Sequence, residues 1–414
     1  MINAATTPTR KIIHQSCQPY LSTLLICTAV LAPSIALGHG TAKTPAGPND
    51  RTIDFPDTKE YKTLVVDLHT HSVFSDGHVW PKIRVAEALR DGLDGLAITE
   101  HLEYQPHRAD LLNADRNRAY IEAASAAEGS TLIVIRGSEI TREAPAGHIN
   151  AIFIEDANKL LKVKNPPKDK SDVLGYYTAA NQWPAQNAVE AAHKQGAFIF
   201  WNHPDWTRQA PDGIARINDF HAQNAKNGIL NGIEIANGDY YSEEAFAIAL
   251  EHDLAIIGVS DVHDLIDWDY KPHEGGHRPV TLVLAKDKSI ASLKEGLFAK
   301  RTVVWSRNTL MGRAPDLIPI LEASLSTSKL TYRPDTSVAI ITLSNNSDMN
   351  MQLRYTGAHS LLLSPDRITV PEHGEYELHV KPGKVVDTLA LPFVVENALT
   401  APGQNPSIVL SSQR

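Results

Sequence analysis

Two short motifs place potential metal ligands at alternate positions along the chain. His69 and His71 follow one apolar run, and Asp261 and His263 follow another. Side chains two residues apart on a strand point to the same face, so each pair presents two ligands side by side. Imidazole and carboxylate groups suit Zn²⁺, Mn²⁺ and Fe²⁺. The spacing therefore indicates a metal site to which two strands contribute.

Histidines and acids recur at or near the ends of the other predicted strands. The candidate metal ligands are His69, His71, Asp76, His101, Glu139, His148, His203, Asp261 and His263. In a barrel the carboxyl ends of the strands meet at one rim, where active sites lie. A structural metal site usually has four protein ligands. This larger set, without a cysteine, predicts two or three divalent ions (Zn²⁺, Mn²⁺ or Fe²⁺) that share a bridging carboxylate, which is a catalytic arrangement.

Short apolar runs that alternate with helical patterns are expected to position these residues. Strands are predicted at 63–68, 95–99, 132–135, 149–154, 197–201, 233–236, 255–259 and 280–284. Helical patterns fill most of the gaps, for example at 185–195 and 242–252. Such alternation is typical of an α/β fold with a parallel sheet or barrel. We assign residues 61–324 to this domain.

The pattern changes after about residue 325. Residues 338–343 and 376–380 are predicted strands, and turn residues at 345–347, 371–374 and 381–383 separate the apolar runs. This texture is typical of antiparallel strands joined by short turns. We predict a small C-terminal β-sandwich over 325–414, which ends in a polar tail after about residue 395.

The N-terminus has the pattern of an export signal. Arg10 and Lys11 precede a largely apolar stretch over 21–37, and small residues at 36–38 form a plausible cleavage site. Residues 1–38 are therefore predicted to be a signal peptide and residues 39–60 a linker. Cleavage would remove both cysteines, Cys17 and Cys27. No later stretch approaches the length of a transmembrane helix. The expected location is periplasmic or secreted.

Composition limits the classes of partner. The chain has 414 residues and carries 39 Lys and Arg against 48 Asp and Glu, a net charge of −9. No basic run is present, so a nucleic-acid partner is not expected. The sequence also lacks a phosphate-binding P-loop and a nucleophile elbow, which leaves a Ser-His-Asp hydrolase unsupported.

The ordered motifs resemble those of the polymerase-and-histidinol-phosphatase (PHP) domain family. They lie within residues 64–306 and are His69-Thr70-His71, Ser75-Asp76-Gly77, Thr99-Glu100-His101, Gly137-Ser138-Glu139, His148, Asn202-His203-Pro204 and Ser260-Asp261-Val262-His263. The resemblance implies a metal-dependent phosphoesterase with a distorted (β/α)7 TIM-like barrel and, commonly, three metal ions. With its signal and trailing β-domain, the chain looks most like exported bacterial members, which include phosphodiesterases active on organophosphate diesters.

The resemblance also implies how the ligands divide among the ions. One ion would be held by His69, His71, Glu139 and Asp261. Glu139 would bridge to a second ion, held with His148 and His203. The third ion would be held by Asp76, His101 and His263.

The expected reaction is hydrolysis of a small-molecule phosphate ester by a metal-bridging hydroxide. His277 and Arg278 are candidates for assisting the leaving group, and Arg142 for holding a phosphoryl oxygen. Aromatic residues near the same rim, such as Tyr104 and Trp206, are candidates for an apolar pocket around an organic ester group.

Phosphodiesters are the favoured substrates, because a dianionic monoester calls for concentrated positive charge and this chain is acidic, with scattered arginines. A phosphomonoesterase of the same family and an amidohydrolase-like metallohydrolase acting on C–N or C–O bonds are the alternatives. A non-catalytic binding protein is a third hypothesis, and the complete ligand set argues against it.

Overall fold

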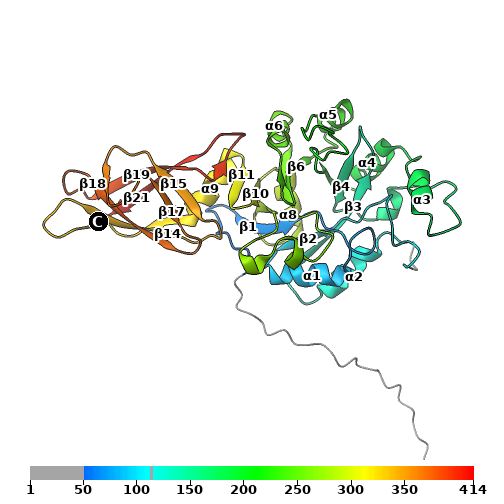
Figure 1. Ribbon diagram of the computed structural model, residues 1–414, viewed down its shortest axis with the longest axis horizontal. Coiled ribbons are helices and arrows are strands. Elements are labelled where there is room, and N and C mark those ends of the chain that lie inside the picture. The colour runs from blue at the N-terminus through cyan, green and yellow to red at the C-terminus, as the bar shows by residue number, and fades with distance from the viewer. Residues whose placement is uncertain (1–50, 112–114) are drawn as a thin grey trace, which may run out of the picture. The chain divides into compact units, whose positions relative to one another are not determined.

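The computed structural model describes residues 51–111 and 115–414 (Figure 1). The predicted signal peptide, with Cys17 and Cys27, and the predicted linker as far as residue 50 lie outside the described residues. Among the residues that are described, no helix is both long and apolar enough to cross a membrane.

The first part of the described chain alternates strands and helices. Its strands are β1 (Lys62–Asp67), β2 (Gly95–Ile98), β3 (Ile133–Thr141), β4 (His148–Ile152), β5 (Phe198–Trp201), β6 (Gly232–Asn237), β7 (Tyr240–Tyr241), β8 (Ala255–Val259), β9 (Val280–Ala285), β10 (Thr302–Ser306) and β11 (Thr309–Gly312). Its helices are α1 (Pro81–Arg90), α2 (Arg118–Ala126), α3 (Val173–Ala180), α4 (Ala185–His193), α5 (Asp219–Lys226), α6 (Glu243–Glu251), α7 (Ile266–Asp269), α8 (Ile290–Phe298) and α9 (Ala314–Ser324).

These strands form one curled, mixed sheet, which confirms the α/β, TIM-like barrel class. With β20 (Ala398–Leu399) from the C-terminal part added at one edge, its order is β20-β11-β10-β9-β1-β2-β3-β4-β5-β6-β7, and β8 pairs with β6. β1, β2 and β3 are parallel, as are β5, β6 and β8. β4 is antiparallel to both of its neighbours. The connection over 142–147 is too short for a parallel crossover, so β3 and β4 form a hairpin instead.

The residues just beyond β1 and β8 bond directly to each other. The Asp261 amide donates to the His69 carbonyl at 3.0 Å, and the His71 amide donates to the Val262 carbonyl at 3.1 Å. This pairing brings together the two motifs spaced i, i+2. β8 also meets β9 through Thr281, whose hydroxyl donates to the Gly258 carbonyl at 2.8 Å.

Local sequence explains where the helices begin. At α6 the Ser242 hydroxyl accepts a hydrogen bond from the Ala245 amide at 3.1 Å, and Glu243 and Glu244 lie in the first turn, where the helix dipole favours acids. At α1 Pro81 occupies the first position, where a missing N–H costs nothing.

The C-terminal part is a β-sandwich of two sheets (orange to red in Figure 1). One sheet has β12 (Leu325–Thr327), β14 (Ala339–Asn345), β18 (Glu375–Lys381) and β16 (Ser360–Leu362), with β13 (Thr331–Tyr332) paired to β14. The other has β17 (Arg367–Val370), β15 (Met351–Tyr355), β19 (Thr388–Val395) and β21 (Ser407–Gln413). The predicted polar tail is therefore a strand, β21, which alternates buried and exposed residues along its length and pairs with β19.

The sandwich and the barrel share structure. β20 (Ala398–Leu399), which follows β19, leaves the sandwich and pairs in parallel with β11 of the barrel sheet. A single apolar cluster includes Leu317 and Leu321 of α9 together with Ile341 and Leu353 of the sandwich. The barrel therefore depends on the C-terminal domain to cover part of its apolar surface.

Deleting residues 325–414 is expected to yield insoluble protein, because it exposes the apolar face of α9 and removes the strand paired to β11. The soluble fraction after expression of the shortened and full-length chains checks this. A soluble, monomeric shortened chain that unfolds cooperatively in urea would contradict it.

Candidate metal centre

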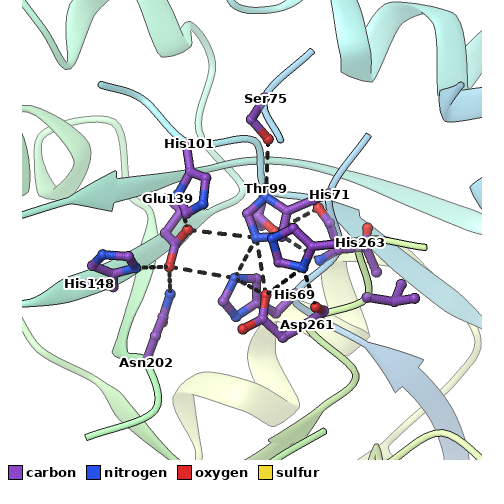
Figure 2. A network of polar contacts seen from close by, with 12 residues as sticks. His69, His71, Ser75, Thr99, His101, Glu139, His148, Asn202, Asp261 and His263 are labelled. Carbon is purple, nitrogen blue, oxygen red and sulfur yellow. Dashed lines mark hydrogen bonds and ion pairs between the residues drawn. The ribbon is translucent and has the colours of Figure 1, made fainter. Parts of the chain in front are cut away.

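The first group of ligands lies where β1 and β8 end (Figure 2). The Nε2 atoms of His69 and His71 are 3.0 Å apart. Asp261 Oδ1 lies 3.2 Å from His69 Nε2 and 3.1 Å from His71 Nε2. Both imidazoles are buried, and their adjacent nitrogens face the same carboxylate oxygen. The two motifs that the sequence singled out thus form one site.

Glu139, the last acid of β3, lies between this group and the next. Its Oε1 is 3.6 Å from His69 Nε2, and its Oε2 is 3.6 Å from His71 Nε2. On the other side, Oε1 is 3.0 Å from His148 Nδ1 and 3.6 Å from His203 Nε2. This is the position that a bridging carboxylate needs.

Asp76 holds the third group together. Its Oδ2 lies 3.2 Å from His101 Nε2, and its Oδ1 lies 3.2 Å from His263 Nε2. His71 adds a ligand atom to the same cluster. His101 also contacts Glu139 through Nδ1, so the second and third groups are continuous. His78, two residues after Asp76, points elsewhere and pairs with Asp264 at 2.6 Å.

The donor set fits divalent metal ions. Asp76 Oδ1, Glu139 Oε2 and Asp261 Oδ1 are buried, and although an imidazole nitrogen lies near each of them, none accepts a hydrogen bond of good geometry from the described residues. Buried carboxylate oxygens without partners are costly, and a cation would satisfy them. Three overlapping clusters of histidine and carboxylate atoms could each hold an ion. Without sulfur ligands, the set suits Zn²⁺, Mn²⁺ or Fe²⁺.

The electrostatics favour the ligand forms of several groups. Burial raises the pKa of Glu139, but His101, His148 and His69 more than offset it, and the pKa falls well below its ordinary value. The Asp261 carboxyl behaves alike, because His69 and His71 outweigh burial and lower its pKa. Burial, together with His263 and His101, lowers the pKa of His71 to about 3. Ionised carboxylates and a neutral imidazole are the forms that bind metals.

Several ligands are oriented by a second partner. Glu234 Oε1 lies 2.7 Å from His69 Nδ1, and Asn202 donates to Glu139 Oε1 at 2.8 Å. Ser75 Oγ lies 3.1 Å from His71 Nδ1. Thr141 Oγ1 lies 2.7 Å from His101 Nδ1. Such partners fix ring orientation in metal sites. Glu234 is not among the residues predicted from the sequence, although a single acid inside an apolar strand is a signal that points to it.

Two of the ligand residues have backbone conformations that are unfavourable for side chains with a Cβ atom. φ is +26° at His203 and +51° at Asp261. Positive φ is uncommon outside glycine and tends to occur at functional sites, where surrounding contacts maintain the strain. At Asp261 that contact is Asn237, which donates to Oδ2 at 3.1 Å.

The structure places Arg278 beneath the ligands rather than at the reacting centre. Its side chain is 1% exposed and donates to Asp67 Oδ2 at 3.1 Å and to Asp91 Oδ2 at 2.6 Å. Asp67 in turn accepts from the Ser260 hydroxyl at 2.6 Å, next to Asp261. Arg278 therefore positions the chain that carries Asp261, in place of the predicted contact with the leaving group.

Arg142 is also occupied by a buried carboxylate. Its Nη2 lies 2.7 Å from Glu103 Oε1, and Glu103 Oε2 accepts from the Thr141 amide at 2.7 Å. The structure thus brings together the nine candidate metal ligands but not the three residues predicted to act beside them, Arg142, His277 and Arg278.

His277 stacks on Trp305, with ring centroids 3.4 Å apart and planes at 2°. Burial lowers the pKa of His277 to about 4. The ring is therefore neutral at pH 7 and lacks the imidazolium proton that a general acid would give to a leaving group.

The same burial predicts a pH effect on stability. An unfolded histidine gains its proton near pH 6.5, whereas folded His277 gains it only near pH 4. Burying the neutral His277 ring therefore costs the folded state no protonation energy above pH 6.5. As the pH falls from 6.5 to 4, the unfolded chain gains a proton that the folded chain cannot bind, and the free energy of unfolding decreases. Between pH 8 and 5, wild type should lose about 2 kcal/mol more unfolding free energy than His277→Phe, which keeps the stack on Trp305. Urea unfolding at both pH values checks this, and equal losses would contradict it.

Comparisons with known proteins agree with this geometry. Residues 67–210 match the PHP domain family, and residues 325–411 match an Ig-like domain family. A two-domain protein from Bacteroides vulgatus that contains a predicted PHP-like metal-dependent phosphoesterase is 35% identical, with a TM-score of 0.77 over 87% of this chain and 98% of that one. No curated protein matches this chain.

Two more distant structures share less. A protein from Bifidobacterium adolescentis assigned as a metal-dependent phosphoesterase is 19% identical over 48% of this chain and 88% of its own, with a TM-score of 0.35. A lesion-specific endonuclease from Pyrococcus furiosus is 14% identical over 65% of this chain and 62% of its own, with a TM-score of 0.36. As the Bacteroides protein and the domain match show, this chain belongs to the PHP family of metal-dependent phosphoesterases and carries an Ig-like domain after its barrel.

Proposed function

We propose that this phosphoesterase hydrolyses phosphodiesters of small organic molecules. Divalent ions held by His69, His71, Glu139 and the other ligands would supply a water of lowered pKa as nucleophile and would offset charge on the phosphoryl oxygens. The chain's own contribution is to keep Glu139 and Asp261 ionised and to orient the imidazoles through partners such as Glu234.

The observation that carries the diester preference is the pairing of the nearby arginines. Three buried arginines each pair with buried acids: Arg84 with Glu87, Arg142 with Glu103, and Arg278 with both Asp67 and Asp91. These guanidinium groups are already neutralised, so they add little positive charge for a dianionic monoester. A diester carries one negative charge, which the ions alone can offset.

Two further arginines lie close to the centre. Arg108 and Arg116 line a cavity of about 30 Å³ beside His101. That volume has room for water but not for a phosphoryl group. Both guanidinium groups contact Tyr176, with Arg108 4.0 Å from the ring centroid and Arg116 bonded to the hydroxyl. They therefore support the wall of the site and leave the preference for diesters unchanged.

The test combines metal content with two substrates. We expect elemental analysis of the purified chain to find two to three ions, and we expect bis(p-nitrophenyl) phosphate to be hydrolysed faster than p-nitrophenyl phosphate. Faster monoester cleavage would make the protein a phosphatase. Bound metal with neither activity would favour hydrolysis of C–N or C–O bonds, and folded protein without metal would overturn the proposed centre.

We also propose that the enzyme is exported. The support is the basic start and apolar stretch of residues 1–38. A reporter that is active only outside the cytoplasm, fused after residue 50, should be active, and replacing Arg10 and Lys11 with glutamate should reduce its activity. An inactive fusion would contradict export.

A further inference from the structure

Aromatic side chains border the metal centre on the side of His101 and His148. The Tyr104 ring lies 6.0 Å from the His101 ring at 70°. The Tyr177 ring lies 6.1 Å from the Tyr104 ring at 90°. Both tyrosines are half-buried, and they come from separate segments of the chain, the loop after β2 and helix α3.

Trp206 completes this border beside the second group of ligands. Its ring centroid lies 5.2 Å from those of both His148 and His203. The side chain is 37% exposed, although it adjoins a buried polar centre. A tight turn fixes its backbone, since the Trp206 amide donates to the His203 carbonyl at 3.0 Å and the Trp206 carbonyl accepts from Gln209 at 2.7 Å.

A polar contact joins the two halves of the border. Tyr177 donates to Glu143 Oε1 at 3.4 Å, and Arg208 Nη2 donates to the same oxygen at 3.0 Å. The Arg208 guanidinium carbon lies 5.3 Å from the Trp206 ring centroid. We call Tyr104, Tyr177 and Trp206 the aromatic rim. Glu143 and Arg208 link Tyr177 to Trp206, so that contacts continue from His101 to His203.

The aromatic rim is close enough to the metal ligands to contact the ester group of a bound substrate. The Tyr104 ring lies 6.0 Å from that of His101, and the Trp206 ring lies 5.2 Å from those of His148 and His203, so a group attached to a phosphoryl oxygen at the centre would meet them. The edge-on contacts already present are the arrangement that aromatic quadrupoles favour. Resting on the proposed function, we propose that the aromatic rim is a subsite for a planar aromatic ester group of the substrate, with Trp206 as its main specificity-determining residue.

The test uses binding of three monoanionic phosphonate methyl esters, which carry the single charge of a diester, to the Mn²⁺-loaded chain, measured by calorimetry: methyl phenylphosphonate, methyl cyclohexylphosphonate and methyl methylphosphonate. They share the phosphonate and differ in the attached group. Wild type should bind the phenyl compound about tenfold more tightly than the methyl compound, which corresponds to about 1.4 kcal/mol. Trp206→Ala should reduce this ratio to about twofold, and because both compounds bind through the same ions, the ratio does not depend on any change in metal content.

Two variants control for general effects. Trp268→Ala removes another exposed tryptophan, 67% accessible on α7, and should keep the wild-type ratio. Trp206→Phe retains a ring and should restore most of the preference. An unchanged ratio in Trp206→Ala would overturn the subsite, and equal binding of the cyclohexyl and phenyl compounds would overturn its preference for planar groups. Failure of all three compounds to bind would instead contradict the proposed function.

Discussion

Glu139→Gln is expected to lose at least one metal ion per chain and to lower the phosphoesterase kcat by a factor on the order of a thousand. The reason is its position between His69 and His71 on one side and His148 and His203 on the other. Glutamine has nearly the same shape, but its amide is neutral and one of its two terminal atoms cannot bind a cation. Elemental analysis and steady-state kinetics with bis(p-nitrophenyl) phosphate measure both effects.

The matched control is Glu122→Gln on α2, which alters a partly exposed glutamate paired with Arg118. It should keep wild-type metal content and activity, because an exposed ion pair contributes little. If Glu139→Gln retained the full complement of metal, Glu139 would not be a bridging ligand. If it lost metal but kept its activity, the bound ions would not be catalytic.

The parts of the centre that the sequence predicts are those set by local geometry. The alternation of a strand predicts His69 and His71 on one face, and likewise Asp261 and His263, although both pairs lie just beyond their strands and Asp261 has a φ of +51°. The tendency of strand ends to meet at one rim then adds Glu139. These inferences need only the period of a strand and its end, and both are visible within a few residues.

The parts that the sequence does not predict depend on distant partners. Arg142 precedes the hairpin to β4 and faces Glu103, and Arg278 faces Asp67, which is 211 positions away. An arginine beside a ligand motif has the same sequence pattern whether it meets a substrate or a buried acid. Only the fold determines which of the two an arginine contacts, because it brings a distant buried carboxylate next to the guanidinium that this carboxylate stabilises.

The strand topology also has parts that follow from local sequence and parts that depend on distant segments. The strand positions follow from apolar runs, but the antiparallel placement of β4 depends on the short connection over 142–147. The departure of β20 from the sandwich to pair with β11 depends on which edge is unpaired. The predicted tail became a strand because Ile408 and Leu410 reach the sandwich core, an alternation that its polar neighbours obscured.

Arg278→Met is expected to lower the free energy of unfolding by about 3–5 kcal/mol, because it leaves Asp67 and Asp91 buried without their cation. Arg51 still reaches Asp91, so the larger cost falls on Asp67. Since Asp67 holds Ser260 next to Asp261, the variant should also bind metal more weakly. Urea unfolding of the metal-free chains measures the first effect, and competition with a chelator measures the second.

A role in positioning and a role in proton or charge transfer to the leaving group predict different outcomes. If Arg278 acted on the substrate, Arg278→Met would unfold like wild type and keep its metal affinity but lose kcat. If it positions Asp261 through Asp67, stability and metal affinity fall together, and Arg278→Lys, which keeps one charge, recovers part of both. Arg90→Met is the control, because it removes an exposed arginine paired with Asp267 and should cost less than about 1 kcal/mol. The charge network beneath the ligands would then be as necessary to the centre as the ligands themselves, although it never meets the substrate.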